Sequence, residues 1–132
     1  MIAAKAKIKF DAQRIAKAAK RGNITSVGHA AAAIRLAARH SIRKSPKRSR
    51  AGTPPNTRKG RLRSAIKYAV GKSPPSAVIG PDVEVAGTSG KAHEFGGRYK
   101  KQRYEKRAFM GPALENVKPR FPAFWKNSIR GG

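Results

Sequence analysis

Two things are scarce in this sequence, cysteine and acidic side chains, and both absences limit what the protein can do. Without cysteine the chain has neither disulfides nor thiolate metal sites, so its stability must come from packing or from assembly. Only 6 Asp and Glu residues accompany 31 Lys and Arg. Catalysis by paired titratable groups therefore has few candidates, and we expect no catalytic residue, no metal site and no cofactor.

Long apolar runs are also missing. No stretch approaches the roughly 18 to 20 apolar residues that a bilayer-spanning helix needs, and the N-terminus lacks the apolar segment of a signal peptide. We therefore expect a protein that is made in the cytoplasm and has no membrane partner. The 132 residues suit a single domain, 1–132, with one core.

What the chain has in abundance is positive charge. Its formal net charge of +25 repels itself strongly unless an anion lies nearby. Nucleic acid fits best, because phosphates accept Lys and Arg and release their condensed counterions. A membrane surface would require these charges on an amphipathic helix with large apolar anchors. An acidic protein is the remaining alternative.

The N-terminal half predicts a short strand followed by two helices. Residues 5–10 alternate basic and apolar side chains, as a half-buried strand does. Asp11 then suits the N-cap of a helix that Gly22 ends. The apolar inner stripe of this first helix would be Ile15 and Ala19. A second helix fits residues 24–44 and would pack against a sheet or against a copy in another subunit, of which we favour the sheet. Its apolar stripe is Val27, Ala31, Ile34, Ala38 and Ile42.

Residues 45–60 form a long basic loop, in which proline and glycine alternate with Lys and Arg. Between residues 39 and 63 there are ten Lys or Arg and no carboxylate, a density that should keep the isolated loop mobile until assembly orders it. The plain alternative is a solvated face that only keeps the protein soluble. We predict that the loop and its flanks face DNA or an acidic partner, through Arg43, Lys44, Lys47, Arg48, Arg50, Arg58, Lys59, Arg61 and Arg63.

The remainder predicts a β-meander and a terminal helix. Strands are expected over 61–71 and 76–80, joined by a turn at Pro74 and Pro75, with further strands over 83–86 and 91–95. A C-terminal helix should have Pro112 at its first position, and prolines 119 and 122 should divide it. The aromatics Phe121, Phe124 and Trp125 share a helical face and suit the core better than an exposed anchor. The fold class is α+β: a small curved antiparallel sheet flanked by N-terminal helices and a C-terminal helix.

Three smaller patterns carry little chemistry. His93 and Glu94 are adjacent, so on a strand they would point to opposite faces, which disfavours a joint acid-base or metal role. His29 and His40 could share a helix face, but no third ligand is near in sequence. Gly96-Gly97 lacks the spacing of a phosphate-binding loop.

Three segments in order carry a resemblance to a known family. They are Thr57-Arg58-Lys59-Gly60-Arg61-Leu62-Arg63-Ser64-Ala65-Ile66, then Ala92-His93-Glu94-Phe95-Gly96-Gly97, then Arg107-Ala108-Phe109-Met110-Gly111-Pro112-Ala113-Leu114. Over about residues 10–129 the chain resembles the small neck or tail-completion proteins of long-tailed bacteriophages. Those proteins typically carry "T-G-x-L-R-x-S-I", "hydrophobic-E-F-G" and "P-F-hydrophobic-x-P-A-L" in this order. The chain departs from the pattern by inserting Arg58-Lys59 and by placing Ala65 and Ala108 where serine and proline are common.

The resemblance implies a non-enzymatic virion protein. It implies a ring, commonly a hexamer, at the junction of phage head and tail, where DNA passes. Partners would be copies of the chain, other neck, portal-adaptor and tail-tube proteins, and genomic DNA without sequence preference. It also implies a subunit interface at Glu94, Phe95, Gly96, Gly97, Phe109, Met110, Pro112 and Leu114. The alternative is a free basic nucleic-acid-binding protein of ribosomal or histone-like type, which the charge alone would favour.

Overall fold

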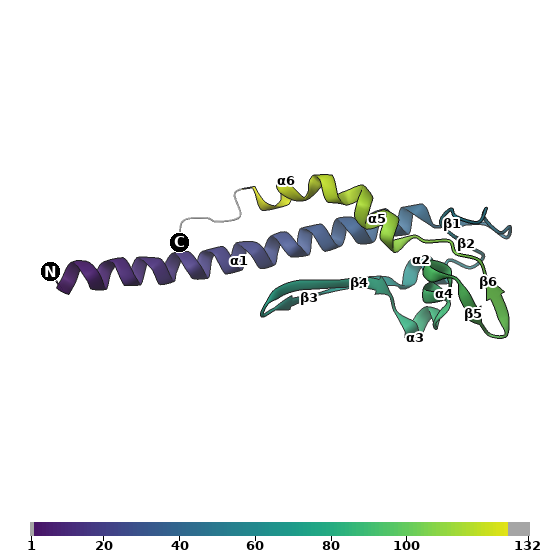
Figure 1. Cartoon of the computed structure of the whole chain (residues 1–132), viewed down its shortest axis with the longest axis horizontal. Coiled ribbons are helices and arrows are strands. Elements are labelled where there is room, and N and C mark those ends of the chain that lie inside the picture. Colours follow the sequence, from purple (N-terminus) through teal and green to yellow (C-terminus); the bar gives the residue numbers. More distant parts are fainter. Residues whose placement is uncertain (1, 127–132) are drawn as a thin grey trace.

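A single long helix dominates the fold. The computed structural model describes the backbone of residues 2–126 and the side chains of residues 14–126, and its first element is the helix α1 (Ile2–Ser41), whose N-terminal part extends beyond the other elements (Figure 1). The predicted strand over 5–10, the N-cap at Asp11 and the helix end at Gly22 are therefore wrong. Lys and Ala are strong helix formers, and one interior glycine costs only about 1 kcal/mol relative to alanine, which the flanking residues overcome.

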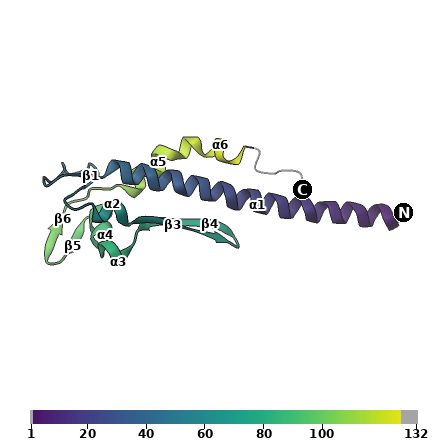
Figure 2. The ribbon, with the colours of Figure 1, turned by 180° about the vertical axis from the view of Figure 1, so that it is seen from behind.

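The apolar stripe of α1 is confirmed. Ala31, Ile34 and Ala38 are buried and Val27 is partly buried. Ile42 is buried too, but it lies just after the helix, which ends at Ser41 and not at the predicted residue 44. Ile15 is 60% exposed and does not form the predicted inner stripe of the first helical segment. On one side α1 packs against the strands β3 (Ile66–Lys72) and β4 (Pro75–Pro81), as predicted for a sheet. On the other side it contacts the C-terminal helices, so that α1 lies between two layers (Figures 1 and 2).

The β-meander is only partly confirmed. β3 and β4 form the predicted antiparallel ribbon, with Tyr68 opposite Ile79. Residues before β3 form the short helix α2 (Arg61–Ala65) instead of strand. The other two predicted strands are helices, α3 (Val83–Ala86) and α4 (Ser89–Phe95). Asp82 caps α3, since its side chain accepts a hydrogen bond of 2.9 Å from the Glu84 amide.

Two further ribbons complete the α+β fold. β1 (Arg43–Lys44) and β2 (Asn56–Thr57) pair in parallel, β1 directly before the basic loop and β2 within it, so the predicted loop contains a short strand. β5 (Gly97–Tyr99) and β6 (Gln102–Tyr104) form an antiparallel hairpin. The strands of the described residues thus form three separate two-stranded sheets, and the α+β class is confirmed.

The C-terminal helix is divided by its prolines, as predicted. α5 (Met110–Val117) passes through the 3-10 turn η1 (Lys118–Arg120) into α6 (Phe121–Trp125). Pro112 is the third residue of α5, not the first. Phe121 and Phe124 are partly buried against the core, as predicted. The Trp125 indole donates a 2.8 Å hydrogen bond to the side chain of Asn23, which attaches α6 to α1.

The core lies where α1, α2 and α5 meet. Its largest fully buried side chains include Ile42 just after α1, Ile66 at the start of β3, and Phe109 and Val117 at the two ends of α5. Ala38 and Ala65 are completely buried among them, so that helix backbones approach closely. This cluster holds the basic loop and the β5–β6 hairpin at one end of the molecule (Figure 1).

Candidate nucleic-acid interface

All nine basic residues predicted to face DNA or an acidic partner are exposed. They lie on β1, in the loop that follows it, in the turn before α2 and on α2 itself. Two other arginines of α1 bind within the chain. Arg35 Nε donates to the carbonyl of Ile66 at 3.0 Å, and Arg39 Nε donates to the carbonyl of Arg63 at 3.1 Å. The predicted set is therefore free of the core and open to solvent.

The basic loop has a defined position within a single chain. Its Gly52 amide donates to the carbonyl of Lys106 at 3.0 Å, and Arg107 Nε donates to the carbonyl of Ser49 at 3.1 Å. Within the loop, Asn56 Nδ2 donates to the carbonyl of Lys47 at 3.1 Å. The bonds of Lys106 and Arg107 fasten the loop to the segment that follows β6, some fifty residues later in the sequence.

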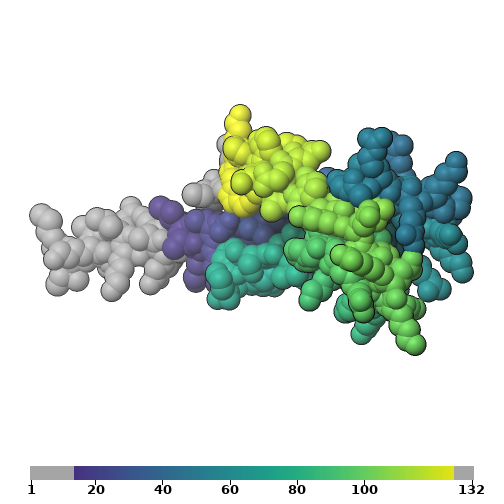
Figure 3. Space-filling model, turned by 45° about the vertical axis from the view of Figure 1, so that its right-hand side comes forward, coloured from purple at the N-terminus to yellow at the C-terminus, as the bar shows by residue number. Residues whose placement is uncertain are grey.

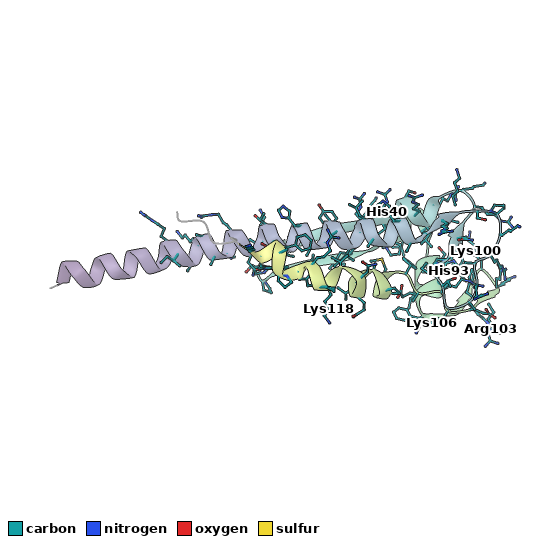
Figure 4. All side chains as sticks on the ribbon, turned by 90° about the horizontal axis from the view of Figure 1, so that it is seen from above. His40, His93, Lys100, Arg103, Lys106 and Lys118 are labelled. Carbon is teal, nitrogen blue, oxygen red and sulfur yellow. The ribbon has the colours of Figure 1, made fainter. Side chains whose placement is uncertain are left out.

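The β5–β6 hairpin adds basic residues that the sequence analysis did not predict for the site. It brings Lys100, Arg103 and the following Lys106 to the same end of the molecule, near His93 (Figure 4). In the space-filling view the loop and the hairpin lie together at one end (Figure 3). In the sequence, this basic hairpin is indicated by the repeated dipeptide Arg-Tyr, which occurs at 98–99 and at 103–104 on either side of the turn.

Between loop and hairpin lies a hollow of about 850 Å³, here called the basic groove. Four basic residues line it, and the only carboxylate among its lining residues is that of Glu105. That carboxylate is 71% exposed and lies 3.9 Å from Arg107 Nη2, at the outer limit of an ion pair. The four basic residues are Arg48, Arg103, Lys106 and Arg107.

His93 lies in the wall of this groove. Its ring packs edge-on against Tyr104 with centroids 4.9 Å apart, and its Nδ1 is buried without a hydrogen-bond partner. Burial, and secondarily the positive charge of Arg107, lower the pKa of His93 below its usual 6.5. The imidazole therefore favours its neutral form. His29 and His40 are both exposed on α1, and no group of three or more metal-binding side chains occurs among the described residues.

Glu94 has a structural task that adjacency in sequence could not reveal. Its Oε1 accepts hydrogen bonds from the amides of Phe109 at 3.0 Å and Met110 at 2.8 Å, and its Oε2 accepts from Gly111 at 3.1 Å. These amides belong to the N-terminal end of α5, where free N–H groups and the helix dipole attract a carboxylate. Glu94 thus caps α5 from α4, and both of its oxygens are engaged within the chain.

Several residues predicted for the subunit interface have roles inside the chain. Phe109 is only 1% exposed and lies in the core, so its assignment as a contact for a neighbouring subunit is wrong. Met110 is partly buried against the same core. Gly96 and Gly97 have φ values of +76° and +138°, so the chain needs glycine there to pass from α4 into β5. A close approach to another subunit is not required to explain them.

The remaining predicted interface residues are open to solvent. Phe95 is 72% exposed and Leu114 is 40% exposed. Pro112, two residues before Leu114, is exposed as well. Phe95 directly follows Glu94, so one side chain of this pair is used within the chain while the other points away from the core.

Comparisons with protein-family models, with curated proteins and with solved structures find no match for this chain. No helix among the described residues combines the length and the apolar character that crossing a membrane requires. Function must therefore be inferred from the geometry above and from the sequence elements.

Proposed function

We propose that the protein is a non-enzymatic structural subunit of a ring at the head-to-tail junction of a long-tailed phage, located in the virion and assembled in the host cytoplasm. The observation that carries this proposal is the Glu94 cap. It joins the second family-like element, which contains Glu94, to the third, which contains Phe109 and Met110. These two elements thus have a physical reason to occur together.

Surface chemistry supports the same proposal. Phe95 and Leu114 remain exposed beside these elements and are suited to contact neighbouring subunits or other neck and tail proteins. The nine exposed basic residues lie at one end of the molecule, where they would meet the DNA of the channel or an acidic neighbour. Phe95 also lines the hollow between the loop and the hairpin, so the assembly contact and the polyanion contact would adjoin.

Negative-stain microscopy of the purified full chain, and of particles that contain it, tests the proposal. Closed rings of fixed symmetry are the expected result. Phe95→Ser should weaken ring formation, because it removes a highly exposed aromatic side chain, whereas Val78→Ser changes an exposed apolar residue, 77% accessible, on the distant β4 and should not.

A free nucleic-acid-binding protein is the second candidate, and the net charge of +25 favours it. It predicts monomers that coat DNA evenly and form no rings at any protein concentration. That result would overturn the ring proposal and leave the polyanion contact in place.

A further inference from the structure

We infer that the basic groove is a binding site for the phosphate backbone of DNA, formed jointly by the loop and the β5–β6 hairpin. This deepens the DNA contact of the proposed function and rests on that part of it. Arg48 comes from the loop, and Arg103 and Lys106 come from the hairpin and the residues that follow it. The contact is therefore built from two segments, and not from the basic loop alone, as the sequence suggested.

Two buried polar atoms point to a ligand in the groove. Ser49 Oγ and His93 Nδ1 are both buried without a hydrogen-bond partner, and both residues line the groove. Unpaired buried polar groups are rare in folded proteins because they lose their hydrogen bonds to water. A hydroxyl can donate to a phosphate oxygen, and so can an imidazole nitrogen that carries a proton. Both atoms are closed to solvent in this structure, so their side chains would turn toward the groove to donate to a phosphate bound there.

The site extends beyond one phosphate. A second hollow of about 480 Å³ adjoins the basic groove, since His93 and Asn56 line both. Its basic residues are Lys100, Arg58 and Arg61, with Glu84 as a lining carboxylate. Basic side chains line both adjoining hollows. Such a series is better suited to the regularly spaced phosphates of a nucleic-acid strand than to a single small anion.

The turn of the hairpin gives independent support. Lys100 and Lys101 form the two-residue turn between β5 and β6, and both have positive φ, 49° and 64°. Turns of this kind favour Asn-Gly, because lysine adopts the left-handed region at a cost. Non-glycine residues held in this region cluster at functional sites. Here Lys100 lines the second hollow, next to the groove.

Binding of the full chain to a short fluorescent DNA duplex, measured by anisotropy at increasing salt, tests the inference. The double variant Arg103→Ser/Lys106→Ser should reduce the slope of log affinity against log salt by about 1.8, because each phosphate that is no longer neutralised lowers it by about 0.9. The matched control Lys17→Ser/Lys20→Ser removes the same charge from exposed positions on α1 and should change the slope far less. Equal effects of the two variants would overturn the groove as the site.

A second variant keeps the test independent of folding. Lys100→Asn/Lys101→Gly should make the hairpin more stable to urea, because Asn-Gly adopts the positive φ values of this turn more readily than lysine does. It should also weaken DNA binding, because it removes two positive charges. Unchanged binding by this variant would contradict the inference. Binding of the wild-type chain to polyglutamate but not to DNA would also contradict the inference. Ring formation, scored by microscopy on the same variants, reports on the proposed function separately.

Discussion

At the scale of single residues, Glu94 is the side chain whose removal should be most informative. Glu94→Ala would leave the amides of Phe109, Met110 and Gly111 without their acceptor. We expect the free energy of unfolding to fall by about 2 kcal/mol, the upper range for removal of a helix cap. Urea denaturation measures it. Glu115→Ala, on the exposed side of the same helix, is the control and should have little effect.

His93 predicts a pH dependence of stability. Because its pKa in the folded protein lies below 6.5, the unfolded chain binds more protons near that pH, and stability rises as the pH increases. The contribution is complete above the unfolded-state pKa and disappears as the pH falls through 6.5 toward the folded-state pKa. His93→Gln should flatten this part of the curve in urea titrations from mildly acidic to neutral pH. An unflattened curve would show that His93 does not cause the slope.

At the scale of elements, two helical glycines predict opposite outcomes for the same substitution. Gly28→Ala in α1 places its Cβ in ordinary contact, 3.8 Å from Val70 Cγ2, and should stabilise the protein by up to about 1 kcal/mol. Gly90→Ala in α4 drives its Cβ into the ring of Pro81 and should destabilise by about 1 to 3 kcal/mol. Urea unfolding of both variants checks this. Equal stability of the two would mean that α4 and β4 do not pack as described.

At the scale of the whole molecule, the distribution of charge decides the partner. Replacing Lys47, Arg48 and Arg50 by Ser should lower the slope of log DNA affinity against log salt by about 0.9 for each phosphate that the loop neutralises. The measurement uses the full chain and the same short duplex. A slope equal to that of the wild-type chain would exclude these three side chains from the interface and would contradict a groove that the loop and the hairpin form jointly.

The sequence by itself determined what depends on local pattern and composition. The buried stripe of Ala31, Ile34, Ala38 and Ile42 follows from helical periodicity, and the division of the C-terminal helix follows from two prolines. The β3–β4 ribbon and the exposed basic loop were likewise readable from alternation, turn residues and charge.

Only the tertiary structure decided the short elements and the site. Segments as short as 83–86 and 89–95 fit strand and helix periods equally well, and their caps and packing partners selected helix. Glu94 meets its first donor fifteen residues away, and the loop meets the segment after β6 some fifty residues away. Such contacts have no trace in local spacing, because the chain must fold before these groups meet. The cap and the basic groove therefore belong to the fold and not to any single motif.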